Sequence, residues 1–296
     1  MKAAALRQSS FLFFQDVYKS YGSKVVLDDI DLAVAQGELV TVVGPSGCGK
    51  STLLRLALGQ ELPSSGQVLI DGKPCGFADR SRGIVYQKYS LFPHLNVVDN
   101  VLLGSRLSSG FFERRRRRRE FEDEAMRYLR RMGLEEHSRK FPHELSGGMR
   151  QRVAIAQSLI MKPKILLMDE PFGALDPGSR ENMQIFLLEL WEEFGMTIFF
   201  VTHDLEEAVF LGTRIIVLSQ YYTDSRGETA QRGARVVCDY ALPKEAKSTA
   251  VKAAASFGEL IQQIREQGFN PAYLRHASSF NLKHPHSFQT LRPEER

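Results

Sequence analysis

Apolar residues recur along the chain in two patterns. Short runs such as Glu38–Val43 are almost continuously apolar, which is typical of strands buried on both faces of a parallel sheet. Elsewhere apolar residues return every three or four positions, as from Met183 to Phe194, which is typical of an amphipathic helix. Strands that alternate with helices predict an α/β fold. Further buried strands are expected at Gln67–Ile70, Gly83–Tyr86, Lys164–Met168, Thr197–Val201 and Arg214–Leu218.

The two ends of the chain depart from this alternation. Phe11–Tyr18 and Lys24–Ala35 are rich in β-branched and aromatic residues, so two strands are expected, separated by a break at Tyr21-Gly22. After Ser219 the pattern loosens. There the sequence predicts a polar, extended loop at Tyr221–Gly233 and a last strand at Val236–Leu242. A helix at Ser256–Gln267 and a mobile tail at His276–Arg296 are expected to follow.

Composition excludes several classes of protein. The chain has 296 residues, of which 43% are hydrophobic, and a net charge of +4, so it is too apolar to be disordered. Its longest apolar runs are strand-sized, so neither a membrane span nor a signal-peptide core is expected. Three cysteines (Cys48, Cys75 and Cys238) without CxxC spacing argue against a disulfide scaffold or a cysteine zinc site and favour a reducing cytosol.

A glycine-rich segment with the pattern GxxxxGK[ST] follows the apolar run that ends at Val43. Its glycines let the backbone wrap a phosphate at a helix N-terminus, Lys50 reaches the β- and γ-phosphates, and the Ser51 hydroxyl is a Mg²⁺ ligand. The alternative is a glycine-rich turn that contains lysine by chance. The candidate nucleotide-binding residues are Gly44, Ser46, Gly47, Cys48, Gly49, Lys50, Ser51 and Thr52.

Two carboxylates end another predicted buried strand. Asp169 would hold Mg²⁺ through water, and Glu170 would orient or deprotonate the attacking water. The alternative is that both are solvated acids before Pro171.

These motifs, taken with one further segment, resemble a known family. Leu145-Ser-Gly-Gly-Met-Arg-Gln-Arg152 is similar to the signature of ATP-binding cassette (ABC) ATPases and precedes Asp169 at the family's spacing. Weaker elements occur in the family's order: Tyr21 resembles the aromatic that stacks on adenine, and Gln87 the glutamine that touches Mg²⁺ and water. Asp176 resembles a residue of the D-loop and His203 the switch histidine at the γ-phosphate.

The resemblance implies a fold and a dimer. A P-loop core with a mostly parallel sheet would carry an N-terminal antiparallel β-subdomain and a small helical subdomain. The ATPase domain would span 1–245, with the helical subdomain at about 88–160, and 246–296 would form a C-terminal helix and tail. Two cassettes would meet head to tail, so that Ser146, Gly147 and Gly148, at the start of an apolar helix, contact the ATP of the partner.

The implied function is transport. The chain would be the ATP-hydrolysing, Mg²⁺-dependent subunit of an ABC transporter, peripheral to the cytoplasmic face of the inner (plasma) membrane. Its partners would be a membrane permease and an extracytoplasmic solute-binding protein, with no nucleic acid. Motifs around Phe141–Met149 and Asp169–Asp176 most resemble importers of nitrate, sulfonate or taurine, although Gln157 and the Tyr221–Gly233 loop depart from the family pattern. An exporter ATPase and a non-transport ATPase are the alternatives, and the solute is not encoded here.

Two local features remain open. Six arginines, Arg114–Arg119, stand among five acids, so that 113–124 carries only +1. A solvated helix start with i,i+4 pairs is favoured over lipid or nucleic-acid contact; the pairs expected are Arg116–Glu120, Arg118–Glu122 and Arg119–Asp123. Cys48 is expected either to be reactive, with a pKa lowered by a helix N-terminus, or to fill a small space.

Overall fold

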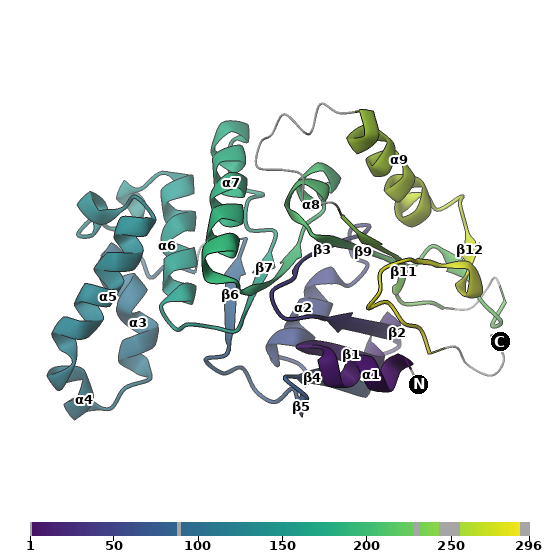
Figure 1. Cartoon of the computed structure of the whole chain (residues 1–296), viewed down its shortest axis with the longest axis horizontal. Helices are drawn as coiled ribbons and strands as arrows, with labels where there is room; N and C mark the ends of the chain where they lie inside the picture. The colour runs from purple at the N-terminus through teal and green to yellow at the C-terminus, as the bar shows by residue number, and fades with distance from the viewer. Residues whose placement is uncertain (1, 88–89, 228–230, 243–254, 291–296) are drawn as a thin grey trace. The chain divides into compact units, whose positions relative to one another are not determined.

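The computed structural model describes residues 2–87, 90–227, 231–242 and 255–290 (Figure 1). The chain divides into two compact units. The first joins Met1–Ala78 to Leu187–Arg296, and the second is Asp79–Phe186. The boundary predicted near residue 245 lies outside the described residues. No helix in the described ranges is long and apolar enough to cross a membrane.

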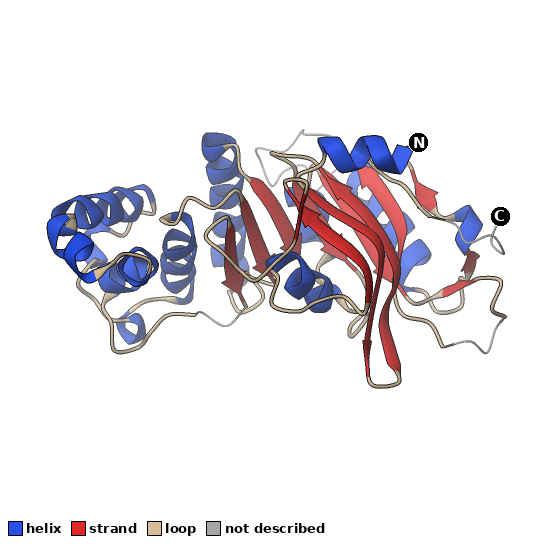
Figure 2. Cartoon of the chain, turned by 90° about the horizontal axis from the view of Figure 1, so that it is seen from below, coloured by secondary structure: helices blue, strands red, loops and turns tan. Residues whose placement is uncertain are grey.

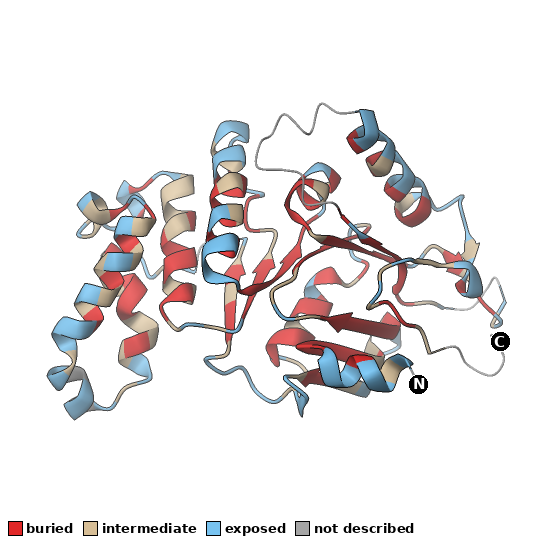
Figure 3. Ribbon diagram, viewed as in Figure 1, coloured by how far each residue is buried: buried red, intermediate tan, exposed pale blue. Residues whose placement is uncertain are grey.

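A mostly parallel sheet forms the centre of the first unit. Strands β3 (Leu39–Val43) and β8 (Thr197–Val201) pair in parallel, and β3 also pairs in parallel with β9 (Arg214–Ser219). Strand β11 (Arg235–Ala241) runs antiparallel to β9, and the short β13 (Asn281–Leu282) follows β11 in parallel. Every residue of β3, β8 and β9 is buried, which explains their largely apolar character (Figure 3).

Helices of the first unit follow these strands. Helix α2 (Lys50–Leu58) comes directly after β3, and α8 (Leu205–Leu211) comes after β8. Helix α9 (Ala255–Phe269) packs against β9 and β11. Helix α9 was expected at Ser256–Gln267, and its ends differ from the expected ones by two residues at most.

A second, antiparallel sheet completes the first unit. Its strand order is β2-β1-β4-β5, with β1 at Leu12–Tyr21, β2 at Lys24–Val34, β4 at Ser65–Ile70 and β5 at Lys73–Pro74. The β1–β2 hairpin is long and turns between Tyr21 and Lys24 (Figure 2). Helix α1 (Lys2–Ser9) lies on this sheet and buries Leu6 against Phe13.

The second unit is largely helical. Strands β6 (Arg82–Tyr86) and β7 (Ile165–Asp169) pair in parallel. Helices α3 (Val97–Leu107), α5 (Arg118–Arg131) and α6 (Gly147–Leu159) pack together, and 3₁₀ turns at Glu135–His137 and Pro142–Glu144 join α5 to α6. Phe121, Ala125 and Leu129 of α5 recur at helical spacing and are buried. Helix α7 (Pro177–Phe194) spans the boundary between the units.

The arginine run spans the end of one helix, a break at Arg117 and the start of the next helix. Helix α4 (Phe111–Arg116) ends before Arg117, and α5 begins after it. The predicted Arg118–Glu122 pair is present at 2.8 Å. Glu120, expected to pair with Arg116, is instead bound by Arg117 at 2.7 Å, because the break turns the Arg117 side chain between Glu113 and Glu120.

The described part of the C-terminal segment, which was predicted to be a mobile tail, has local structure and packs on the first unit. Strand β12 (Arg275–His276) pairs with β10 (Tyr222–Thr223), and a 3₁₀ turn follows at Ala277–Ser279. Farther on, the Phe288 ring stacks on Phe13 with ring centroids 5.1 Å apart. One aromatic residue among polar ones gives no periodic signal, so the sequence did not reveal this packing. Residues 291–296 lie outside the described ranges.

Candidate functional site

The phosphate-loop motif connects β3 to α2 in the first unit. Gly47 and Gly49 have φ angles of +76° and +103°, a backbone conformation that glycine adopts without strain. Lys50 is buried, and its Nζ donates to the carbonyls of Gly44 at 2.8 Å and Pro45 at 3.1 Å. The ammonium group is therefore held against the loop rather than extended into solvent.

Neighbouring strands also require glycine in this loop. A Cβ atom on Gly44 would lie 2.2 Å from the Leu218 carbonyl oxygen of β9, and one on Gly49 would lie 2.8 Å from the Val26 side chain of β2. Ser46 and Gly47, by contrast, are exposed at the tip. The loop is thus tightly packed at both ends and open where a phosphate would approach.

His203 leaves the sheet at the same edge as this loop. Strands β3 and β8 are parallel and pair Val42 with Val201, so the segments that follow them emerge side by side. The turn is fixed internally: the Thr202 hydroxyl donates to Glu207 at 2.6 Å and accepts from the Asp204 amide at 3.1 Å. His203 itself is exposed, so the structure brings this predicted residue to the phosphate loop and presents it outward.

Tyr21 lies at the tip of the β1–β2 hairpin. Tyr21 is 43% exposed, and its hydroxyl donates to the Glu61 carboxylate. Lys19 lies 5.0 Å from the ring centroid and also pairs with Glu61, as does Arg55. Glu61 was not predicted from the sequence, and it holds the tyrosine by its polar end while the ring remains accessible.

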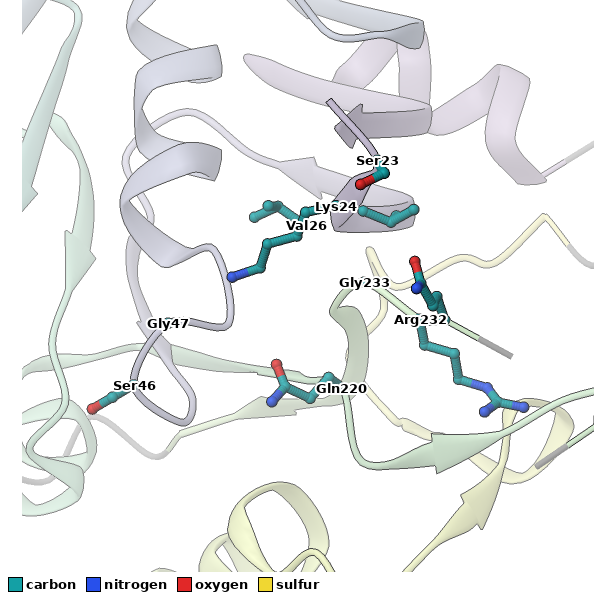
Figure 4. A pocket seen from close by; sticks show the side chains of 10 residues that line it. Ser23, Lys24, Val26, Ser46, Gly47, Gln220, Arg232 and Gly233 are labelled. Atoms are coloured by element: carbon teal, nitrogen blue, oxygen red, sulfur yellow. The ribbon is translucent and has the colours of Figure 1, made fainter. Parts of the chain in front are cut away.

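A cavity of about 470 Å³ adjoins the phosphate loop (Figure 4). It opens between the start of β2, the loop tip and the segment after β9, all within the first unit. The lining residues are Ser23–Val26, Ser46, Gly47, Gln220 and Gln231–Gly233. The sequence did not predict that Gln220 and Arg232 line this cavity. Both lie at the ends of the Tyr221–Gly233 loop, whose length departs from the family pattern.

The second unit carries the predicted acids and glutamine. Tyr86 of β6 pairs with Asp169 of the parallel strand β7, so Gln87 and Glu170 are the residues that directly follow two adjacent strands. A Cβ on Gly173 would lie 3.3 Å from Nε2 of Gln87 and 3.5 Å from the Glu170 carbonyl oxygen, so these residues meet around one glycine. Glu170 has φ +46°, a conformation that costs a non-glycine residue energy and that is often found at functional sites.

The signature segment of the second unit begins helix α6. Ser146 is its N-cap, and its hydroxyl accepts from the Met149 amide at 3.3 Å. Gly147 and Gly148 form the first turn, where amide groups lack partners within the helix. Asp176 accepts from the Ser179 amide at 2.9 Å, and hydrogen bonds from Ser179 lower the pKa of this carboxyl.

Cys48 fills space rather than forming a reactive thiol. It is only 1% exposed, and a Cβ on Gly44 would lie 2.8 Å from its Sγ. Burial raises the pKa of the Cys48 thiol and outweighs the nearby Lys50 charge, which lowers it. The expectation of a lowered pKa is therefore wrong, because the loop turns the side chain into the protein.

The donor groups of the phosphate loop fit a nucleotide, and each unit carries oxygen atoms of the kind that bind Mg²⁺. The phosphate loop offers backbone, ammonium and hydroxyl donors, with Ser51 exposed in the first turn of α2 and Thr52 buried beside it. The Ser51 hydroxyl, the Asp169 carboxylate and the Gln87 amide oxygen are ligands of the hard kind that Mg²⁺ prefers. Their roles as metal ligands remain predictions.

Comparisons with known proteins agree with this arrangement. Residues 27–173 match the family model described as ABC transporter. The taurine import ATP-binding protein TauB of Pseudomonas aeruginosa (strain UCBPP-PA14) is 40% identical over 257 residues, which are 86% of this chain and 92% of that protein. The spermidine/putrescine import ATP-binding protein PotA of Mesoplasma florum is 42% identical over 216 residues, 72% of this chain and 60% of that protein.

A solved structure shows the same fold. The ATP-binding cassette MJ0796, a dimer in a post-hydrolysis state bound to ADP and phosphate, is 31% identical, with a TM-score of 0.64 over 78% of this chain and 99% of that one. The predicted α/β fold is confirmed, as is the resemblance on which it rested. This chain belongs to the ABC transporter family, as an ATP-binding subunit that hydrolyses ATP.

Proposed function

We propose that this chain powers the import of a small anionic solute, of the sulfonate or taurine kind, through a separate membrane permease. One observation carries the proposal: the similarity to a taurine import protein extends over 92% of that protein's length. The polyamine import protein has similar identity, but this chain matches only 60% of its length. The match to the taurine import protein thus covers nearly that whole protein, whereas the match to the polyamine import protein leaves two fifths of that protein unmatched.

Within one chain the residues divide into two groups with separate tasks. In the first unit, Lys50 and the phosphate-loop amides would bind the β- and γ-phosphates, and His203 would contact the γ-phosphate. The exposed Tyr21 ring would stack on the base. A bound Mg²⁺ would neutralise phosphate charge, with Ser51 as its ligand on this unit.

The second group would complete the reaction. Glu170 would accept a proton from the attacking water, and Gln87, which follows the adjacent strand β6, would contact the same water. Asp169, at the end of β7, would hold the metal through water. In a head-to-tail pair of chains, Ser146, Gly147 and Gly148 would offer a helix N-terminus to the partner's nucleotide, and Asp176 would lie at the same interface. Hydrolysis would then require closure of the pair.

The cavity beside the phosphate loop supports this assignment of tasks. Its volume of about 470 Å³ is in the range of small-molecule sites, and its lining combines loop residues with Lys24 and Arg232. Lys24, a cationic side chain beside an anion-binding loop, suits a phosphorylated ligand, whereas Arg232 is paired with Asp224.

The experiment is to purify the chain from its native membranes in mild detergent and to identify the proteins that accompany it. A multi-spanning partner, together with a solute-binding protein that binds taurine or another sulfonate but not spermidine, is the expected result. A solute-binding protein selective for polyamines would overturn the anionic solute and leave import standing. A membrane partner with no solute-binding protein would favour export. Recovery without any membrane partner, and turnover stimulated by DNA or RNA, would overturn transport.

A further inference from the structure

Three potential metal ligands converge in the first unit, remote from the residues assigned to ATP. Glu38 directly precedes β3, and His284 and His286 follow β13. One carboxylate oxygen of Glu38 lies 3.2 Å from Nδ1 of His286 and 3.8 Å from Nε2 of His284. These three ligand atoms all lie within 4.8 Å of one another.

The spacing of the three atoms suits a single transition-metal ion. Zinc binds imidazole nitrogen and carboxylate oxygen at about 2.0–2.2 Å in tetrahedral geometry, so neighbouring ligand atoms are about 3.3 Å apart. The two distances to Glu38 bracket that value. The side chains are 10% exposed for His284, 34% for His286 and 16% for Glu38, which leaves a path from solvent.

Two of the three ligands, His284 and Glu38, are held by a second contact. The His286 amide donates to Nδ1 of His284 at 3.2 Å, so that the other ring nitrogen, Nε2, faces Glu38. The second oxygen of Glu38 accepts from the Ala35 amide at 3.0 Å and from Arg214 at 3.2 Å. The contacts to Glu38 hold that carboxylate in place, as second contacts do in known metal sites. The contact to His284 leaves the ring proton on Nε2, so this ring must move its proton from Nε2 to bind a metal.

The charges around the cluster favour a cation. Arg214 is fully buried and binds both oxygens of Asp239, at 2.8 and 2.6 Å, as well as Glu38. The single positive charge of Arg214 therefore faces two negative carboxylates. One negative charge remains, on Glu38 beside the rings of His284 and His286.

The backbone around the histidines is held independently of any ion. The amides of Lys283 and His284 both donate to the Asp239 carbonyl at 3.1 Å, and the Ser287 hydroxyl donates to the Asp239 carboxylate. The ligands are thus positioned by β11 before a metal arrives, which lowers the cost of binding.

We propose that Glu38, His284 and His286 bind one divalent transition-metal ion of the Zn²⁺ class, with water at the fourth position. Two imidazoles and a carboxylate are the ligands such an ion prefers, whereas Mg²⁺ and Ca²⁺ prefer oxygen ligands alone. Because the two histidines belong to the C-terminal segment and Glu38 leads into β3, the ion fastens that segment to the strand that carries the phosphate loop.

Titration of the metal-stripped, nucleotide-free full-length chain with Co²⁺ and with Zn²⁺ tests the site. We expect one equivalent of Co²⁺ to give the intense visible absorption of a tetrahedral complex, Zn²⁺ to displace it, and Zn²⁺ to raise the unfolding temperature. His286→Gln, which changes the most exposed ligand, should weaken binding at least tenfold. His276→Gln, an exposed histidine near the same segment, should leave it unchanged.

The alternative is that the three side chains form hydrogen bonds and transfer protons among themselves but bind no metal. Absorption of the octahedral type, or equal binding by the wild type and by the double variant His284→Gln/His286→Gln, would overturn the proposal. Circular dichroism of each variant establishes that the chain still folds. If His286→Gln folds and still binds one equivalent as tightly as the wild type, the assigned ligands are wrong.

Discussion

The backbone amide of Thr202 donates to the carbonyl of Val42 at 3.1 Å. This bond extends the parallel pairing of β3 and β8 by one step beyond Val201, up to the point where the phosphate loop begins. His203 is the next residue, so its position is set by the same strand pair that sets the loop. The turn contributes rigidity through the buried Thr202–Glu207 bond, which leaves the histidine ring as the exposed part.

Replacing His203 with alanine should lower ATP turnover by about 10²- to 10⁴-fold, the range expected when a group that acts on the reacting atoms is lost. Nucleotide affinity should change little, because the phosphate loop and Lys50 are untouched. Phosphate release and titration with a fluorescent nucleotide measure the two effects separately. His276→Ala is the matched control, and turnover near the wild-type rate in His203→Ala would remove this residue from the reaction.

Replacing Glu170 with glutamine should abolish most turnover for a different reason. Glutamine matches the shape of glutamate and should fit the φ +46° backbone equally well, but it cannot accept the proton. We expect a loss of about 10²- to 10⁴-fold and a stable ATP-bound dimer, since closure no longer leads to hydrolysis.

Sedimentation with and without ATP detects that dimer. Glu181→Gln, an exposed residue of α7, is the control and should stay near the wild type in both turnover and association state. A monomeric Glu170→Gln chain in saturating MgATP would contradict the head-to-tail arrangement, and normal turnover would assign the base elsewhere.

The Tyr21 ring, rather than its hydroxyl, should contribute to nucleotide binding. Stacking of a base on an aromatic side chain is worth about 1–3 kcal/mol, which corresponds to a loss of about 5- to 150-fold in affinity for Tyr21→Ala. Tyr21→Phe loses only the bond to Glu61 and should bind nearly as well as the wild type. Equilibrium titration with ATP and with inorganic triphosphate measures the affinities. Equal weakening by Tyr21→Ala and Tyr21→Phe would show that the hydroxyl contact matters instead.

Local periodicity predicted the strands that build the site. Thr197–Val201 has the predicted bounds because all five residues are buried, so the apolar run and the strand coincide. The glycine-rich loop was equally visible, since only a few residue types tolerate its backbone. The resemblance to a family then supplied Tyr21, Gln87 and His203, which no pattern of spacing would have singled out.

Contacts between distant segments were not predictable in this way. The stacking of Phe288 on Phe13 and the pairing of Tyr21 with Glu61 join residues that carry no local signal. Cys48 shows the same limit within a motif: a helix N-terminus lowers a thiol pKa only if the sulfur faces it, and here the sulfur is turned toward Gly44 and buried. Side-chain direction is a tertiary property.

Brief alkylation of the native chain should therefore modify Cys75 first. Cys75 is half-buried, whereas Cys48 and Cys238 are buried and burial raises the pKa of both thiols, that of Cys238 to about 11. Because the thiolate is the reactive form, we expect Cys75 to react at least about tenfold faster, with little loss of ATPase activity. Peptide mapping after timed treatment with N-ethylmaleimide measures this.

The same reaction in urea is the control, in which all three cysteines should react alike. Rapid modification of Cys48 in the folded chain, with inhibition that MgATP prevents, would show instead that the loop opens often enough to expose the thiol.

Asp224 should make the stability of the first unit depend on pH. It is buried and accepts from Arg226 at 2.9 Å and from Arg232 at 3.2 Å. Burial alone would raise the pKa of Asp224, but the hydrogen bonds from Arg226 and Arg232 outweigh it and hold the pKa well below its usual value. The ionised carboxylate thus stabilises the folded chain above about pH 4, the ordinary pKa of an aspartate, and this contribution is lost as the pH falls through the lower folded value.

Asp224→Asn should accordingly lower the unfolding temperature by a few degrees at pH 7, because hydrogen bonds to charged groups are worth about 1.5–3 kcal/mol. The difference from the wild type should stay constant down to about pH 4 and then shrink as acid protonates the wild-type carboxylate. Thermal unfolding of both chains from pH 7 to the lowest pH at which they fold measures it. Asp123→Asn, an exposed residue of α5, should differ little from the wild type at any pH. A gap that persists undiminished in acid would mean that Asp224 acts through its shape and not through its charge.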